Sequence, residues 1–349
     1  MQKGVLVALG SAVLFGISTP LAKLLVGTVP PLELAGLLYI GSGIGLSLVL
    51  IGRKLWTRRT SSIVLPRGRE WLWLAGAILF GGVVAPVALI YGLMTSSASN
   101  ASLLLNLEAV FTAILAWFLF RENFDRRVML GMGAIVAGGV LLVWAPGKGG
   151  DASFGSVLVA LACLCWAIDN NLTRKVSTSD AIFIAGLKGL AAGAVNLSLA
   201  FLLGFSLPPL APFGLALTVG FVGYGMSLVL FVLALRNLGA ARTGAYFSVA
   251  PFFGAGLAVL LQGDAVTFPF IAAGLLMAAG VWLHLTERHG HWHKHELQEH
   301  SHAHSHDDHH QHSHDFSWDG KEPHVHPHVH PPLAHVHAHY PDVHHRHTH

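Results

Sequence analysis

Residues 101–120 read ASLLLNLEAVFTAILAWFLF, and Glu108 is the only charged side chain in this run. An α-helix of about 20 residues crosses the hydrocarbon core of a bilayer. Nine further apolar runs of about 18–24 residues do not alternate with polar residues, which argues against membrane β-strands. We therefore predict an all-α integral membrane protein with ten transmembrane helices. The predicted helices cover residues 4–26, 32–52, 71–93, 101–120, 128–145, 154–174, 181–204, 212–234, 243–261 and 267–286.

The last five apolar runs repeat the first five. One register aligns Glu108 with Ala250 and Ala109 with Pro251. An odd number of spans in each copy forces the two copies into opposite orientations across the bilayer. We therefore predict two inverted five-helix repeats, an architecture of many secondary transporters. Further aligned pairs are Phe120-Arg121-Glu122 with Gln262-Gly263-Asp264, Gly138 with Gly280 and, in a second register, Gly4 with Gly155, Phe15 with Trp166 and Lys23 with Arg174.

Three motifs in each copy carry a family resemblance. The chain resembles the EamA-type transporters of the drug/metabolite transporter superfamily over about residues 4–285. The resemblance implies a ten-helix carrier, and many members of the family export metabolites. Ala109 stands where the family often has proline, so the resemblance gives no support for a kinked fourth helix, and Asp264 stands where glutamate is usual. The motifs are SLLLNLE (102–108), FLFRE (118–122) and 131–139 in the first copy, and VAP (249–251), LQGD (261–264) and 274–280 in the second.

Apart from Lys148, the basic residues between the predicted spans lie in alternate loops. Cytoplasmic loops of membrane proteins carry an excess of Lys and Arg, so we predict a multi-pass protein of the plasma (inner) membrane with both termini in the cytoplasm. The pI near 9.0 then reflects topology and does not indicate nucleic-acid binding. The expected units are residues 1–146, residues 151–286 and a tail at residues 287–349. The basic residues of these loops are Arg53, Lys54, Arg58, Arg59, Arg67, Arg69, Arg121, Arg126, Arg127, Arg174, Lys175, Arg236 and Arg242.

Polar and ionisable side chains inside the predicted spans are the candidate site residues, because each charge at that depth costs about 2.5–3.5 kcal/mol on insertion. Glu108 and Asn106 lie in the fourth span, Asp169 and Asn170 in the sixth and Lys188 in the seventh. We hypothesise that Glu108 binds substrate or a coupling proton, and the alternative is a hydrogen-bonded packing residue. For Asp169 and Lys188 we weigh a buried ion pair against a substrate site.

The two cysteines, Cys163 and Cys165, lie inside the predicted sixth span. They are two residues apart on a helix, so their side chains diverge and cannot form a disulfide with each other. We interpret them as inert buried thiols, with a soft-metal site as the alternative. All histidines lie at or after His284, so the other spans lack a Ser–His–Asp set, and we expect neither an enzyme nor a required cofactor.

The segment after residue 286 repeats His-x-His many times and carries interspersed Asp and Pro. Such a composition cannot bury a core, so we expect disorder. Imidazole suits divalent Zn, Ni, Co and Cu, and we expect weak, exchangeable metal sites that serve as a buffer or sensor. The alternative is a solvated tail whose metal binding is incidental. The candidate ligands are His300, His302, His304, His306, His309, His310, His312, His314, His324, His326, His328, His330, His335, His337 and His339.

Three functions remain open at this point. The first is a secondary transporter that exports a small polar metabolite, driven by a gradient. The second is a transporter of divalent transition-metal ions, although the spans lack His, Cys and carboxylates grouped at ligand spacing. The third is a membrane-anchored metal-binding or sensor protein. The expected partners are the lipid bilayer, a small-molecule solute and divalent metal ions, with a homodimer as the candidate assembly and no nucleic acid.

Overall fold

The first half of the chain is helical, as its apolar runs predict. The computed structural model describes residues 2–57, 65–120, 126–144, 150–176, 179–238, 240–286, 290–295, 298–304, 324–330 and 333–338. The elements of the first half are α1 (Gln2–Leu25), α2 (Pro31–Thr57), α3 (Glu70–Ala77), the π-helix η1 (Ile78–Val84), α4 (Ala85–Thr95), α5 (Ala98–Leu104), α6 (Leu107–Phe120) and α7 (Arg126–Val143).

The second half repeats this order of elements, with a second π-helix inside its third segment. Eight helical segments of the described chain are long and apolar enough to cross a membrane, and two shorter apolar helices, α13 and α14, follow them. These segments make the chain an all-α membrane protein. The elements of the second half are α8 (Gly150–Arg174), α9 (Ala181–Leu202), α10 (Leu210–Val219), η2 (Gly220–Met226), α11 (Ser227–Leu238), α12 (Ala240–Phe247), α13 (Ala250–Gln262) and α14 (Phe268–Leu285).

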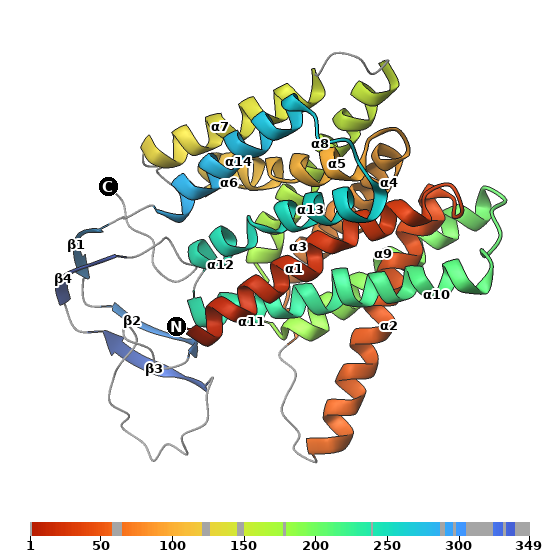
Figure 1. Cartoon of the computed structure of the whole chain (residues 1–349). Helices are drawn as coiled ribbons and strands as arrows, with labels where there is room; N and C mark the ends of the chain where they lie inside the picture. The colour runs from red at the N-terminus through yellow and green to blue at the C-terminus, as the bar shows by residue number, and fades with distance from the viewer. Residues whose placement is uncertain are drawn as a thin grey trace. The chain divides into compact units, whose positions relative to one another are not determined.

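Helices of one half pack against helices of the other. Helix α2 packs along α9, and α7 packs along α14 (Figure 1). Helix α1 packs on α10, η2 and α11, and α8 packs correspondingly on α3, η1 and α4. Lipid gives no hydrophobic drive to helix association, so small residues at the crossings allow close backbone contact. At the α2–α9 crossing, a Cβ atom on Gly189 would lie 2.5 Å from the Gly43 nitrogen.

The two π-helices occupy matching places in the two halves. The register that aligns Glu108 with Ala250 also aligns η1 with η2 over their whole lengths. Pro86, the second residue of α4, has no amide hydrogen, so the turn before it cannot complete the α-helical hydrogen-bond ladder. Segment η2 instead contains Gly220, and a Cβ atom there would lie 1.9 Å from the Leu38 carbonyl oxygen. Single π turns of this kind are frequent at functional sites.

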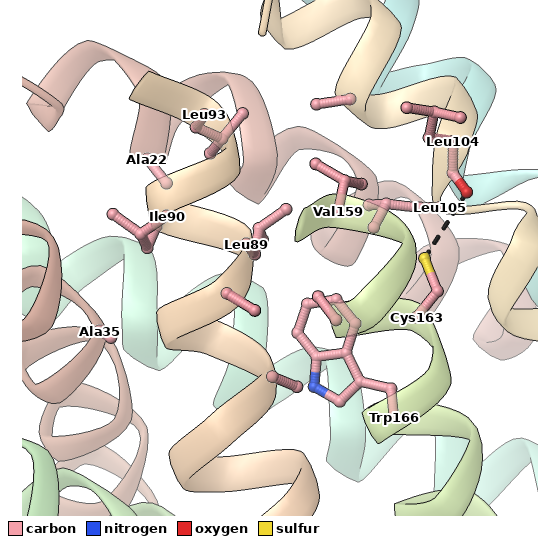
Figure 2. Close-up of a cluster of buried hydrophobic side chains, with 14 of the residues drawn as sticks. Ala22, Ala35, Leu89, Ile90, Leu93, Leu104, Leu105, Val159, Cys163 and Trp166 are labelled. Atoms are coloured by element: carbon pink, nitrogen blue, oxygen red, sulfur yellow. Dashed lines mark hydrogen bonds between the residues drawn. The ribbon is translucent and has the colours of Figure 1, made fainter. Parts of the chain in front are cut away.

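The core of the helical unit lies between α2, α4, α5 and α8. Leu89 and Leu93 of α4 face Val159 of α8, and Ile90 lies on the other side of α4, toward Ala22; all of them are buried (Figure 2). Trp166 of α8 lies at the lower edge of the same cluster. These side chains fix α8 against α4, and α8 carries two of the predicted site residues.

The histidine-rich tail forms a compact unit of its own. In its described residues, β1 (Gly290–His295) pairs antiparallel with β4 (Leu333–Ala338), and β2 (Gln298–His304) pairs antiparallel with β3 (His324–His330). The disorder that we expected for the tail at residues 287–349 stays a prediction. Histidine recurs at every second position along these segments, which matches the two-residue period of a strand.

Candidate transport site at the interrupted helices

The fourth helical segment is interrupted at Leu105 and Asn106, between α5 and α6. Turn-type bonds cross the gap, with the Asn106 amide nitrogen donating to Leu103 O at 3.0 Å and the Glu108 amide nitrogen to Leu105 O at 3.1 Å. The Asn106 side-chain nitrogen also donates to Leu103 O at 3.0 Å. The sequence predicted one continuous helix over residues 101–120, and this interruption is a correction. It forms without proline because a side-chain amide stabilises the turn.

Cys163 contributes to the same interruption. Its thiol donates to Leu104 O, the last residue of α5, at an S–O distance of 3.6 Å (Figure 2). Carbonyls at a helix end lack partners within the helix, and an unpaired carbonyl is costly in lipid. The thiol is therefore a structural donor, which is a more specific role than the inert packing that we predicted.

The ninth segment is interrupted at the matching position. Helix α12 ends at Phe247 and α13 begins at Ala250, the residue that aligns with Glu108. Ser248 aligns with Asn106, and its hydroxyl donates to Gly244 O at 2.9 Å. We predicted a single span over residues 243–261, so this break is a second correction. Interrupted helices at corresponding positions of two repeats are the best general indicator of a transporter's binding site.

Glu108 lies in the first turn of α6, immediately after the break. A carboxylate is stabilised there because the exposed amides of a helix N-terminus carry partial positive charge. Its Oε1 accepts a hydrogen bond from the Asn170 side-chain nitrogen at 2.8 Å, and that nitrogen lies 3.5 Å from Thr112 Oγ1. Glu108 is partly exposed and Asn170 is exposed. The hydrogen-bonded pair therefore lies at the surface of the helical unit and is not sealed in its core.

Asp169 and Lys188 form the buried ion pair that we weighed from the sequence. The Lys188 ammonium donates to Asp169 Oδ2, and the two side chains are 9% and 6% exposed. The Thr173 hydroxyl donates to Asp169 Oδ1 at 2.9 Å. Each carboxylate oxygen thus has a partner, which a buried charge pair requires. The pair joins α8 to α9 one residue before Asn170.

The π-helix η1 lies directly against this ion pair. Gly81 O accepts hydrogen bonds from the Tyr39 hydroxyl at 2.5 Å and from Trp166 Nε1 at 3.0 Å. A Cβ atom on Gly81 would lie 1.9 Å from Asp169 Oδ2, so only glycine leaves room for that carboxylate. The Asn196 side-chain nitrogen donates to Gly82 O at 3.2 Å. Carbonyls released by the π turn are thereby satisfied by side chains of three other segments.

The structure groups four of the five predicted site residues. Glu108 contacts Asn170, and Asp169, the neighbour of Asn170, contacts Lys188. Asn106 instead serves the helix break: it is 2% exposed, its amide lies 3.8 Å from the Met277 sulfur, and its Oδ1 lacks a hydrogen-bond partner in the described part of the chain. Sequence reasoning missed Tyr39, Gly81, Thr112, Trp166 and Thr173.

The predicted metal ligands of the tail divide into two sets. His300, His302, His304, His324, His326, His328, His330, His335 and His337 lie on the four strands. His306, His309, His310, His312, His314 and His339 lie outside the described residues.

Two hollows lie in the helical unit, and neither includes Glu108. The first, of about 320 Å³, is wholly apolar and is lined by Leu107, Phe111, Val140 and neighbouring residues of α6 and α7. The second, of about 450 Å³, lies between α4, α8 and α9, where Asn196 is its only amide side chain. Apolar hollows of this kind suit lipid chains better than a polar solute, so the polar cluster remains the candidate site.

Two like halves of membrane-spanning helices with paired interruptions define a class of membrane transporter. The sequence matches the EamA-like transporter family twice, over residues 2–144 and over residues 153–286. The chain therefore belongs to the EamA-like transporter family, and it is a transporter and not an enzyme. Because the family consists of transporters, we no longer consider the hypothesis of a membrane-anchored sensor that does not transport.

The similar proteins agree with this assignment. The chain is 30% identical over 289 residues to an uncharacterized transporter of Methanothermobacter thermautotrophicus, covering 78% of this chain and 83% of that protein. It is 27% identical over 253 residues to an uncharacterized transporter of Archaeoglobus fulgidus, covering 67% of this chain and 83% of that protein. One solved crystal structure superposes with a TM-score of 0.61 at 19% identity, covering 81% of this chain and 98% of that chain. That likeness concerns the fold alone.

Proposed function

We propose that this transporter is a secondary carrier that exports a small polar metabolite, and that Glu108 and Asn170 bind the solute or a coupling proton. The observation that carries the proposal is the polar cluster at the break of the fourth segment. A carboxylate begins a half-helix there, accepts a hydrogen bond from an exposed amide, and lies beside a buried ion pair. Polar groups at membrane depth are costly and mark solute or proton pathways.

We infer that the ten helical segments form two inverted five-helix halves. One contact supports this arrangement directly. The Ser99 amide nitrogen, at the start of α5, donates to Asp264 Oδ2, just beyond the end of α13, at 2.9 Å. The fourth segment therefore begins beside the point where the ninth segment ends, and this supports opposite directions for the two segments.

We place both termini in the cytoplasm and the protein in the plasma (inner) membrane. The inner end carries the basic loops, and there Arg53, near the end of α2, contacts Asp180, the cap of α9, at 3.1 Å. At the outer end, the Lys23 ammonium donates hydrogen bonds to Leu93 O and to Ser96 O. These bonds hold the end of α1 against the end of α4. The excess of basic residues at one end supports this orientation.

Thiol labelling in intact cells tests the topology. Cys163 and Cys165 are buried, so the wild-type chain supplies a low background. The exposed loop residue Leu65 is expected inside, whereas Phe205 and Val266 are expected outside. A membrane-impermeant maleimide should label the Phe205→Cys and Val266→Cys variants and spare Leu65→Cys. Equal labelling of all three variants would refute the alternating arrangement.

An organic solute fits the site better than a metal ion. Among the described residues, no group of three or more His, Cys, Asp or Glu side chains gathers in a way that could hold a metal ion. The cluster instead offers one carboxylate, one exposed amide and hydroxyls, which are hydrogen-bonding partners for a polar organic molecule.

Survival of cells that lack this gene tests the proposal. Growth is measured against amino acids, other polar metabolites, and Zn, Ni, Co and Cu salts, with wild type, Glu108→Gln and Glu70→Gln supplied in turn. Glu70 is a matched control because its carboxylate lies at the loop before α3, where it accepts a hydrogen bond from the Arg67 backbone amide at 2.7 Å. We expect protection against one class of metabolite, lost in Glu108→Gln and retained in Glu70→Gln. Protection against metal salts alone would refute the metabolite-carrier proposal and favour a transporter of metal ions.

A further inference from the structure

A lysine joins the outer ends of α1 and α4. Lys23 lies in the last turn of α1, and its ammonium donates to Leu93 O and, at 3.0 Å, to Ser96 O. Ser96 follows the last residue of α4, so both carbonyls belong to the end of that helix. Carbonyls at a helix end lack partners within the helix, and a cation there also interacts favourably with the helix dipole. Lys23 is therefore bound to the first half of the chain.

Two side chains of the second half bind the first half at the same end. Gln262, the last residue of α13, donates from Nε2 to Pro20 O of α1 at 2.8 Å. The Asp264 carboxylate accepts the Ser99 amide hydrogen of α5 at 2.9 Å and attracts the Lys23 ammonium. We call Lys23, Gln262 and Asp264 the outer latch. The outer latch connects the two halves of the transporter at the outer end.

Close backbone packing fills the space between the outer latch and the two helix breaks. Half-helices α5 and α13 connect the breaks to the outer end, and α1 packs against both. A Cβ atom on Gly16 of α1 would lie 2.2 Å from Ala250 O, and one on Gly254 of α13 would lie 2.8 Å from Ser102 Oγ of α5. The three segments therefore touch, and these contacts leave no room for a solute.

The inner half lacks the equivalent packing. The repeat relates α5 to α12 and α13 to α6, so the inner counterpart of the α5–α13 contact is a contact between α12 and α6. Half-helices α5 and α13 pack along each other, whereas α6 and α12 do not pack in this way in the part of the chain that the structure describes. Asn170 is exposed beside α6, and Glu108 is partly exposed. The two like halves are thus closed against each other at the outer end and looser at the inner end.

We propose that the outer latch is the closed outer gate of this transporter, and that the structure is its inward-facing state. In alternating access one repeat moves against the other around a fixed site. Opening the outer gate separates α13 from α1 and α5, which breaks the contacts of Gln262 and Asp264 with the first half. Lys23 stays bonded to the end of α4 and is ready to attract Asp264 again. The proposal rests on the topology proposed above and does not depend on which solute is carried.

Thiol labelling behind the outer latch tests the gate. Ser102 is buried there, and its hydroxyl has no hydrogen-bond partner among the described residues, so Ser102→Cys is a mild change that supplies a reporter. A small membrane-impermeant thiosulfonate reagent is added to intact cells, and the rate of labelling at each cysteine is followed by mass spectrometry. The reporter should react slowly when the outer latch is intact, because the gate is closed.

Variants of the outer latch should raise this rate. Asp264→Ala in the reporter chain removes a charged contact between the halves, so the open population and the labelling rate should rise by about 10- to 100-fold. Gln262→Ala removes a neutral bond and should raise the rate by about 2- to 10-fold. Asp264→Glu keeps the carboxylate and should stay near the slow rate. The matched control is Ser97→Ala, which should not change the rate, because the Ser97 hydroxyl lies at the same end and bonds to Asn100 N and Ser99 Oγ of α5.

An unchanged rate in Asp264→Ala, or fast labelling of the reporter with the outer latch intact, would overturn the gate. The buried Cys163 and Cys165 report on folding in the same samples. If they react as fast as the reporter in Asp264→Ala, the latch maintains the fold and is not a gate. Acceleration seen only in inside-out vesicles would refute the outer position of the latch. The labelling needs no solute, so it separates failure of the gate from failure of the metabolite proposal, which the survival assay tests.

Discussion

The π-helix η1 crosses α8 in the same way as the π-helix η2 crosses α1, but the side chains at the two crossings differ. Gly81 of η1 lies against Asp169, and the matching Gly223 of η2 lies against Ser18, which takes the place of Asp169 in the repeat. A Cβ atom on Gly81 would lie 1.9 Å from Asp169 Oδ2, and one on Gly223 would lie 2.5 Å from the Ser18 Cβ. The backbone crossing is thus duplicated, whereas only one copy contains a charge.

The interrupted helices repeat this contrast. The break before α6 is followed by Glu108, and the break before α13 by Ala250 and Pro251. The second copy makes its break with a proline, and the first makes it with Asn106 and the Cys163 thiol. Both copies therefore have the same backbone break, whereas the polar groups that we propose bind the solute occur at only one of the two breaks. The variants below test this asymmetry.

The largest expected effect follows from breaking the buried ion pair. Lys188→Ala leaves the Asp169 carboxylate buried and unpaired, which should cost about 3–5 kcal/mol of stability. The matched change in the other copy, Ser18→Ala, removes one neutral hydrogen bond to Phe15 O and should cost about 0.5–1.5 kcal/mol. Thermal unfolding of the purified proteins measures both.

The double variant Asp169→Asn/Lys188→Met separates stability from transport. It removes both charges, so it should recover most of the stability lost in the single variant while transport stays impaired. Equal destabilisation by Lys188→Ala and Ser18→Ala would show that the two crossings are energetically alike.

Proline substitutions sharpen the comparison of the two breaks. Ala109 lies in the first turn of α6, where amide hydrogens lack partners in the helix, so Ala109→Pro should change stability by less than about 1 kcal/mol. Ile114→Pro lies in the interior of the same helix and should cost about 3 kcal/mol or more. Thermal unfolding again provides the measurement. Similar losses for both variants would mean that the fourth segment is continuous.

Asn170→Ala tests the accessible side of the cluster. It removes the hydrogen bond to the Glu108 carboxylate, a charge-assisted bond of about 1.5–3 kcal/mol, so transport should fall by about 10- to 100-fold. Stability should change little because Asn170 is exposed. The neighbouring Asn171 is buried and donates to Ala167 O at 2.9 Å, so Asn171→Ala should mainly lower stability. Transport that survives Asn170→Ala unchanged would remove this residue from the site.

A small effect on stability is expected at Cys163. Its thiol donates to Leu104 O at the break in the first copy, so Cys163→Ala should lower the stability by about 1 kcal/mol. Cys163→Ser should recover part of that stability because a hydroxyl also donates. Identical melting temperatures for the serine and alanine variants would argue against the bond to Leu104 O.

The helical segments could be predicted from the sequence, because the length and hydropathy of each apolar run indicate a span. The sequence placed the α14 segment within one residue at each end, predicting residues 267–286 where the helix covers Phe268–Leu285. For Asp169 and Lys188 it favoured an ion pair slightly over a substrate site, since two opposite charges lie at similar depth in consecutive helices, and the two side chains do form an ion pair. Gly41 and Gly43 of α2 are packing residues at helix crossings, because a Cβ atom there would lie 2.2 Å from Leu217 O and 2.4 Å from Leu190 N, respectively.

The breaks and the π turns could not be predicted from the same pattern. Leu105 and Asn106 interrupt a run that is apolar on both sides, and the turn depends on a side-chain amide whose partner is known only in the folded chain. Likewise, Tyr39 and Trp166 are unremarkable in sequence and become site residues because both donate to the Gly81 carbonyl.

Transport by reconstituted protein with and without the Glu108 carboxylate tests the central claim most directly. Wild type and Glu108→Gln are placed in liposomes, and movement of the protective metabolite found in the survival screen is followed under an imposed pH gradient over a range of pH. The account predicts that gradient-driven transport is lost in Glu108→Gln, while the protein remains folded and correctly inserted. An unchanged rate with an unchanged pH profile would contradict it.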